Sequence, residues 1–272
     1  MKKQVVLVTG ASSGIGESTV KVLLANGATV YAAARRMERM QKLKAAGAYP
    51  IQMDVTSDAS MSAGIQSILD QEGRIDVLVN NAGYGSYGAV EDVPIDEARR
   101  QFEVNIFGLA RLTQLVLPTM REQRSGTIIN ISSMGGKVYT PFGAWYHATK
   151  HALEGFSDCL RWETRPFGIN VVVVEPGGIA TPWGVIAAEN LQKNSAKGAY
   201  AEGAAKTAAG LKEMYSGTRL TSPDVIANTI LKAINARRPK TRYAVGFMAK
   251  PVMLLRKIVS DRLFDRMLGV MA

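Results

Sequence analysis

The chain alternates between short, nearly continuous apolar runs and longer stretches in which apolar positions recur every three or four residues. The first pattern is typical of strands buried on both faces of a parallel sheet, and the second is typical of the helices that cover it. The apolar runs predict strands at residues 4–8, 29–33, 50–53, 76–79, 126–131, 170–175 and 243–245. The amphipathic stretches predict helices at residues 17–26, 37–46, 57–72, 95–123, 144–166 and 223–236. This order predicts an α/β fold with a doubly wound parallel sheet of about seven strands and helices on both faces.

Two later stretches break this alternation. Across residues 179–221 the periodicity weakens while alanine, glycine, lysine and serine accumulate. A structureless loop of that length is unusual in a compact domain, so we expect one or two short helices that act as a mobile substrate flap. Residues 251–268, inside a basic C-terminal extension at about 247–272, place apolar and basic side chains at helical spacing. That pattern fits either a basic amphipathic helix on an anionic membrane or a helix docked over a substrate cleft or a subunit interface.

The composition is that of an ordinary globular chain, with 272 residues of which 47% are hydrophobic and 21% are charged. No apolar stretch reaches the roughly 18 residues of a membrane span, and the N-terminal run is too short for a signal peptide. We therefore expect one cytoplasmic domain over residues 1–272, membrane-peripheral if the C-terminal helix binds lipid. The formal charge of +10 is concentrated in residues 237–272, which hold nine Lys or Arg and two Asp or Glu. Because the charge is local, we expect no nucleic-acid partner.

Cysteine and histidine are scarce. Cys159 is the only cysteine, so no intrachain disulfide can form, and its place in a helical pattern predicts a buried, inert thiol. Two histidines and one cysteine without ligand spacing argue against a structural metal.

A glycine-rich turn follows the first predicted strand and opens the first predicted helix. Its pattern is Gly10-x-x-x-Gly14-x-Gly16. Glycines permit a tight turn and a close approach of the backbone to a ligand, and a helix N-terminus attracts a pyrophosphate. In this context the turn predicts a dinucleotide cofactor.

The end of the second predicted strand indicates which dinucleotide is bound. An acidic residue there would hold a ribose 2′-hydroxyl and favour NAD(H). This chain has Arg35 and Arg36, whose guanidinium groups can pair with a 2′-phosphate. The alternative is that the two arginines only begin a solvated helix. We predict NADP(H) in preference to NAD(H).

Tyr146 and Lys150 lie one helical turn apart, and Ser133 lies thirteen residues before Tyr146. A phenol with a pKa of about 10 is a poor proton donor or acceptor at neutral pH. A neighbouring ammonium lowers that pKa and makes proton exchange with an alcohol or a carbonyl feasible. Chance Tyr/Lys pairs at this spacing are common, but a pair that follows a glycine-rich strand-to-helix turn is much more specific.

In order and spacing these motifs resemble the short-chain dehydrogenase/reductase family, in its ordinary single-domain form, over about residues 5–181. The matching positions are Thr9, Gly10, Gly14, Gly16, Asp54, Asn80, Asn81, Ala82, Gly83, Asn105, Ser133, Tyr146, Lys150, Pro176, Gly177 and Thr181. Residues 33–36 and the extended C-terminus are more loosely similar to the 17-beta-hydroxysteroid and retinol dehydrogenase-like branch. The resemblance implies a Rossmann-type fold, a nicotinamide cofactor and a homodimer or homotetramer.

The resemblance also implies a cofactor site along one edge of the sheet. Its contacts would be Gly10, Ser12, Ser13, Gly14, Ile15, Gly16, Arg35, Arg36, Asp54, Val55, Asn81, Ala82, Gly83, Tyr146, Lys150, Pro176, Gly177, Ile179 and Thr181. Among these, Asp54 would contact adenine, Lys150 would hold the nicotinamide ribose, and Thr181 would fix the carboxamide.

The catalytic group implied by the resemblance is Asn105, Ser133, Tyr146 and Lys150. Tyr146 would exchange the proton, and Asn105 would anchor a water that connects Lys150 to solvent. Alternatively, or in addition, Asn105 is a helix-kink residue that satisfies backbone groups. The neighbours Ser132 and His147 are expected to be structural, with His147 packing or lining the rim of the pocket.

The expected reaction is NADP(H)-dependent hydride transfer to or from an apolar ketone, aldehyde or secondary alcohol. We expect substrate contacts from Tyr84, Tyr139, Trp145 and Trp183, with Phe142 nearby, and only Lys137 as a possible partner for a charged substrate. Three alternatives remain open. They are an NAD-linked alcohol dehydrogenase, an epimerase or dehydratase of the extended short-chain group, and a nucleotide-binding regulatory or structural protein without turnover.

Overall fold

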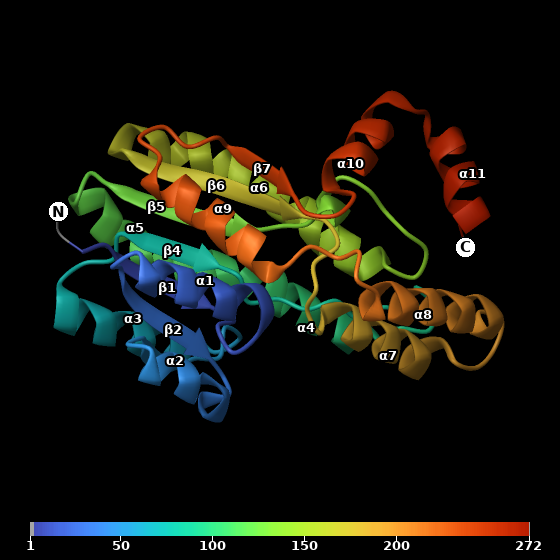
Figure 1. Ribbon diagram of the computed structural model, residues 1–272, viewed down its shortest axis with the longest axis horizontal. Coiled ribbons are helices and arrows are strands. Elements are labelled where there is room, and N and C mark those ends of the chain that lie inside the picture. Colours follow the sequence, from blue (N-terminus) through green and yellow to red (C-terminus); the bar gives the residue numbers. More distant parts are fainter. Residues whose placement is uncertain (1–2, 272) are drawn as a thin grey trace.

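The computed structural model describes residues 3–271, and side chains through residue 268. Seven parallel strands form one sheet in the order β3-β2-β1-β4-β5-β6-β7. Figure 1 shows the part of this sheet from β2 to β7. The strands are β1 (Val5–Thr9), β2 (Thr29–Ala34), β3 (Tyr49–Gln52), β4 (Val77–Asn80), β5 (Gly126–Ile131), β6 (Ile169–Pro176) and β7 (Arg242–Val245). The predicted fold class is confirmed, since helices flank both faces of this all-parallel sheet.

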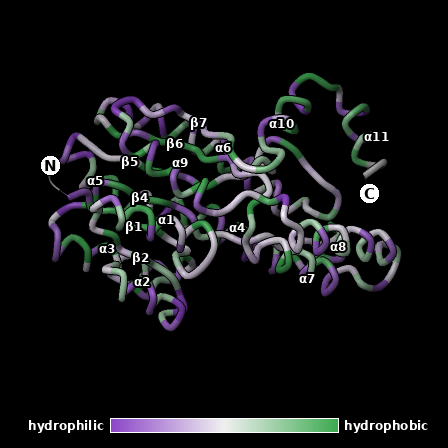
Figure 2. The backbone as a smooth tube through the Cα atoms, in the orientation of Figure 1, coloured by the Kyte–Doolittle hydropathy of each residue, from purple (hydrophilic) through white to green (hydrophobic). Residues whose placement is uncertain are grey.

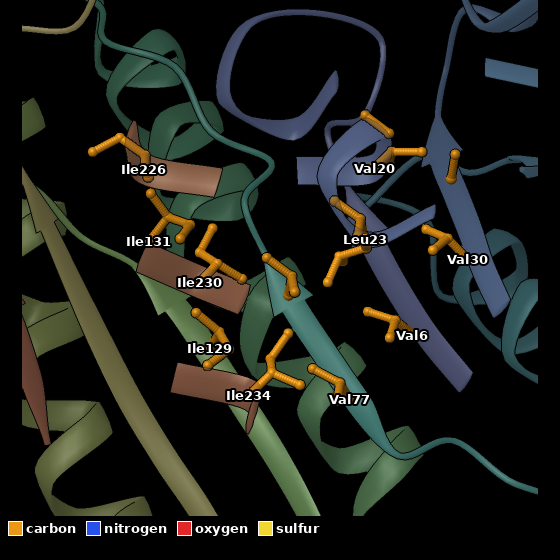
Figure 3. Close-up of a cluster of buried hydrophobic side chains, with 14 of the residues drawn as sticks. Val6, Val20, Leu23, Val30, Val77, Ile129, Ile131, Ile226, Ile230 and Ile234 are labelled. Atoms are coloured by element: carbon orange, nitrogen blue, oxygen red, sulfur yellow. The ribbon is translucent and has the colours of Figure 1, made fainter. Parts of the chain in front are cut away.

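The two faces of the sheet carry separate apolar cores, because successive side chains of a strand point to opposite faces. On one face, Val6 and Val30 pack with α1 (Gly14–Ala25), α2 (Gln41–Ala45) and α9 (Pro223–Asn235), as Figure 3 shows for the part against α1 and α9. On the other face, Leu7 and Tyr31 pack with α3 (Asp58–Glu72), α5 (Gly108–Glu122) and α6 (Ala144–Thr164). Figure 2 shows the corresponding hydrophobic stretches along the strands.

The chain reverses its winding direction between β1 and β4. The sheet grows from β1 through β2 to β3 on one side and from β4 to β7 on the other. At such a switch point the loops after the strands diverge and leave room for a ligand at the carboxyl edge. The glycine-rich turn follows β1, Asn81 follows β4, and Ser132 and Ser133 follow β5, so the chemically distinctive residues meet at this edge.

Several predicted elements differ in detail from the observed ones. The helix predicted at 95–123 is divided into α4 (Ile95–Phe102) and α5 by a π-helical turn at Glu103–Phe107. The expected flap of short helices consists of two longer ones, α7 (Trp183–Ser195) and α8 (Ala201–Ser216), which pack on each other through Leu191 and Ala204. We call α7 and α8 the flap helices.

The C-terminal stretch and Cys159 also correct the sequence analysis. The single helix expected at 251–268 is two helices, α10 (Ala249–Ile258) and α11 (Asp261–Met271), which leave the body of the molecule as an arch (Figure 1). The prediction that Cys159 is buried is wrong, because α6 buries Ser157 and Leu160 and turns Cys159 toward solvent. Within residues 3–271 no helix is long and apolar enough to cross a bilayer.

Candidate active site

A large cleft of about 1450 Å³ runs along the carboxyl edge of the sheet. Its inner wall comes from the ends of β1, β2, β4, β5 and β6, and its outer wall comes from the flap helices and from Leu268 of α11. Most of the predicted cofactor residues line it, namely Gly10, Ser12, Ser13, Ile15, Arg35, Arg36, Asp54, Val55, Asn81, Ala82, Gly83, Tyr146, Lys150, Pro176, Gly177, Ile179 and Thr181. Gly14, Gly16 and Asn105 do not line the cleft, and they contribute by shaping the walls around it.

The glycine-rich turn is fixed by contacts that leave no room for side chains. Gly10 adopts the left-handed φ of 65°. A Cβ on Gly16 would lie 2.4 Å from the Gly10 carbonyl oxygen and 2.5 Å from Asn81 Nδ2. Asn81 Nδ2 in turn donates to the Thr9 carbonyl at 2.9 Å, which ties the end of β4 to the turn. The glycines are therefore required by the backbone path itself.

The first turn of α1 is open at this place. Ser13 stands at the N-cap in an extended conformation, and its side chain makes no capping hydrogen bond. The first amide groups of a helix need acceptors from outside the helix, and the helix dipole favours an anion there. A narrow glycine turn, an uncapped helix start and an adjoining cleft fit the pyrophosphate of a dinucleotide.

Three arginines surround the far end of the cleft, where β2 ends. Arg35 and Arg36 are exposed and line the cleft, and Arg100 joins them from α4. Burial acts to raise the pKa of Asp54, but hydrogen bonds from Thr56 and the positive charges of Arg35 and Arg100 outweigh it, so its pKa lies below the ordinary value. No motif in the sequence marks Arg100, because α4 is placed by its packing against α6 and not by any local pattern.

The Tyr146 and Ser133 side chains lie in contact, as expected from the sequence. Ser133 Oγ accepts the Gly135 N–H at 3.0 Å, so its own proton remains available for Tyr146. Burial raises the pKa of Tyr146 to about 12, and the hydrogen bond with Ser133 acts in the lowering direction. At neutral pH the phenol is therefore protonated.

Lys150 lies below the Tyr146 ring, with Nζ 5.9 Å from the ring centroid, and donates a hydrogen bond of 2.9 Å to the Ile131 carbonyl. Burial lowers the pKa of Lys150 to about 8, whereas the charge of Glu154 raises it. The expectation that Lys150 lowers the phenol pKa is wrong for this arrangement, because burial of the phenol dominates and the ammonium is turned to a carbonyl.

Asn105 lies in the π-helical turn and clamps the segment after β4. Its Oδ1 accepts the Tyr84 N–H at 3.1 Å, and its Nδ2 donates to the Tyr84 carbonyl at 2.9 Å and to the Thr149 hydroxyl at 3.1 Å. This geometry favours the kink interpretation, since the side chain satisfies a backbone segment beside α6. Its role in holding a water stays a prediction.

His147 acts as a structural link, as expected. Its Nδ1 contacts the Gly135 carbonyl at 2.9 Å, while Nε2 accepts the Thr140 N–H at 3.1 Å. This pattern requires a neutral ring with the proton on Nδ1, and burial lowers the pKa of His147 accordingly. The ring fixes the loop between β5 and α6 that forms one wall of the cleft.

A buried group of charges beneath Lys150 was not found by sequence analysis. Glu154, one turn after Lys150, pairs with Lys137 at 2.9 Å and with Arg242 of β7 at 2.9 Å. Glu175 of β6 lies 3.6 Å from the same guanidinium. Burial, and secondly the charge of Glu154, raise the pKa of Glu175 to about 7. One oxygen of each carboxyl group is buried without a hydrogen-bond partner. Lys137, the possible partner for a charged substrate, is thus paired with Glu154 in this structure.

Aromatic rings form the inner part of the cleft beside Tyr146. The Trp183 ring lies 5.0 Å from the Tyr146 ring and 6.1 Å from that of Tyr215, and Tyr87 lies 5.8 Å from Trp183, all between centroids. A Cβ on Gly184 would be 2.2 Å from the Tyr215 ring, so α7 and α8 are in close contact here. Sequence analysis missed Tyr87, which lies in the segment after β4, and Tyr215, which is brought to the site by the packing of α8 on α7.

The four predicted substrate contacts divide into two pairs. Tyr84 and Trp183 line the cleft. Tyr139 instead donates a hydrogen bond of 2.8 Å to Asp265 of α11, and Trp145 is half-buried outside the cleft lining. Tyr139 and Trp145 therefore do not line the cleft, although their neighbours Val138, Thr140 and Pro141 do. Within residues 3–271 no cluster of three or more His, Cys, Asp or Glu could hold a metal.

Comparison with known proteins agrees with this site. Residues 4–192 match the family model of short chain dehydrogenases. A probable short-chain type dehydrogenase/reductase from Helicobacter pylori, VdlC, is 35% identical over 261 residues, which cover 95% of this chain and 94% of that protein. A 3-ketodihydrosphingosine reductase from Bacteroides thetaiotaomicron is 41% identical over 182 residues, 66% of each chain. A solved short-chain dehydrogenase from Streptomyces avermitilis superposes with a TM-score of 0.82 at 36% identity, covering 94% of this chain and 93% of that one. The chain belongs to the short-chain dehydrogenase family and, as a member, is an NAD(P)-dependent oxidoreductase.

Proposed function

We propose that the protein uses NADPH to reduce apolar ketones or aldehydes, and NADP⁺ to oxidise the corresponding alcohols in reverse. The observation that carries the proposal is the Tyr146 hydroxyl, which is buried beside Ser133 between a glycine cradle and an aromatic wall. The cradle fits a dinucleotide, and the wall fits an apolar substrate. The proton donor lies between the two.

In the reduction, the nicotinamide when bound supplies the hydride that reaches the carbonyl carbon. Tyr146 donates its phenolic proton to the carbonyl oxygen, so hydride and proton together convert the carbonyl to an alcohol. Because burial raises the pKa of Tyr146 to about 12, the phenol carries its proton at neutral pH. Ser133 donates a hydrogen bond to the oxygen that gains negative charge.

The preference for NADP(H) rests on Arg35, Arg36 and Arg100. All three line the end of the cleft where β2 finishes, and no carboxylate stands at the end of β2 itself. The nearby Asp54 is engaged by Thr56, whose N–H and hydroxyl donate to Oδ1 at 3.0 and 2.8 Å. Guanidinium groups suit a 2′-phosphate, and an engaged carboxylate offers little to a free 2′-hydroxyl.

The substrate class follows from the inner cleft, where Tyr87, Trp183 and Tyr215 present apolar ring surfaces next to the phenol. A partly matching relative bears the name 3-ketodihydrosphingosine reductase, which denotes a long-chain ketone as that protein's substrate. We infer that a ketone on an extended apolar body fits this chain as well. Polar and charged side chains, including Asn190, Lys193 and Lys206, lie farther out on the flap helices.

The test is NADPH consumption with a series of apolar ketones and aldehydes, for the parent protein and the variant Tyr146→Phe. We expect turnover in the parent and a loss of about a hundredfold or more in the variant, with NADPH binding retained. Equal turnover in both proteins would refute the role of Tyr146. NADPH binding with no turnover of any carbonyl or alcohol would instead favour the regulatory alternative.

A further inference from the structure

Exposed apolar side chains gather at the substrate end of the molecule. Of the fifteen large hydrophobic side chains that are exposed within the described residues, nine belong to the flap helices, to the turn between them or to the region after β7. They are Val185, Ile186, Tyr200, Met214, Met248, Leu254, Ile258, Leu263 and Met267. Figure 2 shows hydrophobic stretches along α10 and α11, outside the body of the fold. An apolar concentration of this kind marks an interaction surface.

The C-terminal arch, which we define as α10 and α11, carries the most exposed part of this surface. Leu254 and Ile258 are one turn apart and 62% and 73% exposed. Leu263 and Met267 repeat the spacing on α11, at 46% and 37% exposed. Side chains one turn apart share a helix face, so each helix presents an apolar edge to solvent.

The arch is held in place by other side chains. Phe264 is buried against the Tyr139 ring, with centroids 5.3 Å apart, and Arg256 lies over both rings. Tyr139 also donates its hydroxyl to Asp265 at 2.8 Å. The arch is thus anchored on one side, and Leu254, Ile258, Leu263 and Met267 are not needed for that attachment.

The arch is also basic. It carries Lys250, Arg256, Lys257, Arg262 and Arg266 against Asp261 and Asp265. Arg256 pairs with Asp261, whereas none of the other four cations forms an ion pair within the part of the chain that the structure describes. These four cations flank the exposed apolar edges.

The occupant of this surface must satisfy both the apolar edges and the cations. A second copy of the chain, docked through the same patch, would bring the two basic surfaces together, since a twofold interface is self-complementary. Juxtaposed like charges oppose such a contact. A bilayer with anionic lipids offers negative headgroups to the cations and acyl chains to the apolar edges.

We propose that the C-terminal arch docks the protein on an anionic membrane surface, with the mouth of the cleft turned toward the lipid. Ile186 and Met214 both line the cleft and are about half exposed, and Leu268 of the arch lines it as well. An apolar substrate dissolved in the bilayer would then enter the cleft without crossing water. This last step rests on the proposed function, whereas the docking itself does not.

The experiment is flotation of the whole protein with vesicles, without cofactor or substrate. One vesicle preparation is phosphatidylcholine alone, and the other contains phosphatidylglycerol as well. We expect flotation with the anionic vesicles only, weakened by added salt because exposed charges are screened. The variants Leu254→Ser/Ile258→Ser and Lys257→Gln/Arg262→Gln/Arg266→Gln should each reduce binding by about tenfold or more.

Matched controls lie away from the arch. Val225→Ser removes an exposed apolar side chain from α9, and Lys42→Gln/Lys44→Gln removes two exposed cations from α2. Both controls should float like the parent. Absence of flotation, or equal flotation with neutral vesicles, would overturn the proposal. A fall in molecular mass of the arch variants without vesicle binding would assign the surface to a second copy instead. Because no turnover is measured, these outcomes are independent of the proposed reaction.

Discussion

The two sides of the cleft are built in different ways. The cofactor side is shaped by backbone, with Gly16 so close to the Gly10 carbonyl that no Cβ fits. The substrate side is shaped by rings such as Trp183 and Tyr215, carried on two helices that lie outside the sheet. A backbone cradle accepts one ligand shape, whereas a wall of side chains can change with each substitution. This contrast explains how one fold can keep its cofactor while its substrate varies.

The strongest test of the contrast is Gly16→Val. Its Cβ would meet the Gly10 carbonyl oxygen at 2.4 Å and Asn81 Nδ2 at 2.5 Å, and the carbonyl cannot move without distorting the turn. We expect the affinity for NADPH, measured by fluorescence titration, to fall by about a hundredfold or more. Gly155→Ala on α6 is the control, because nothing lies within 4 Å of the added Cβ. Unchanged NADPH affinity in a folded Gly16→Val protein would show that the cradle is not set by backbone.

On the cofactor side, the preference for NADPH depends on side chains, namely those of Arg35 and Arg36. Replacing Arg35 and Arg36 by Ala should lower NADPH affinity by about tenfold or more, because charge-assisted hydrogen bonds contribute about 1.5–3 kcal/mol. NADH affinity should change little, and Arg100→Ala should show a smaller loss in the same direction. Arg39→Ala, an exposed arginine outside the cleft, serves as the control. Parallel calorimetric titrations with NADPH and NADH measure the effect, and an equal loss for both cofactors would contradict a 2′-phosphate site.

The same contrast explains which parts of the fold and of the site can be predicted from the sequence. Strand periodicity and the glycine turn predict the sheet and the cofactor side, because both are local in the sequence. Tyr87, Arg100 and Tyr215 reach the cleft only through packing between distant elements, and no local pattern marks them. Proximity in sequence also places Tyr139 in the cleft, but its hydroxyl is bound to Asp265 of α11, a contact that no local pattern predicts.

The sequence predicts that Lys150 lowers the pKa of Tyr146, whereas the structure raises it, and this difference also comes from tertiary packing. Helical spacing places Lys150 one turn away, but it does not reveal that the Ile131 carbonyl takes the ammonium or how deeply the phenol is buried. The buried partners of Glu154 are likewise hidden, since Lys137, Glu175 and Arg242 come from three separate segments of the chain. Desolvation and long-range charge pairs depend on tertiary structure, and a sequence pattern does not contain them.

On the substrate side, Trp183→Ala tests whether the wall can change without affecting the cofactor. The variant loses the ring that contacts Tyr87, Tyr146 and Tyr215. Because aromatic contacts contribute about 0.5–1.5 kcal/mol beyond area burial, we expect KM for an apolar ketone to rise by roughly three- to tenfold. NADPH affinity should stay unchanged, as it should in the control Trp162→Ala on the exposed side of α6. A joint loss of NADPH affinity would mean that the two sides of the cleft are coupled.

The smallest expected effect concerns pH, and it too separates the two sides. On the cofactor side the pKa of Asp54 lies below its ordinary value, whereas beneath the substrate side burial, and then Glu154, raise the pKa of Glu175 from 4.5 to about 7. Arg242 and Lys137 act against that rise, and Asp158 adds to it. The folded protein therefore keeps the Glu175 proton up to about pH 7, while the unfolded chain releases it near 4.5. The contribution of Glu175 to the free energy of unfolding must therefore fall as the pH rises from 4.5 to about 7.

Glu175→Gln mimics the protonated carboxyl group, so the variant should not lose stability as the pH rises. We expect parent and variant to melt together at about pH 5 and the variant to melt about 2–4 °C higher at about pH 8, measured by differential scanning fluorimetry. Glu163→Gln, an exposed carboxyl group on the same helix as Glu154, should follow the parent throughout. If Glu175→Gln instead melts lower than the parent at the higher pH, Glu175 is ionised and its pairing with Arg242 outweighs burial. In that case the ion pairs beneath α6 stabilise the fold, and the substrate side, like the cofactor side, has a fixed support.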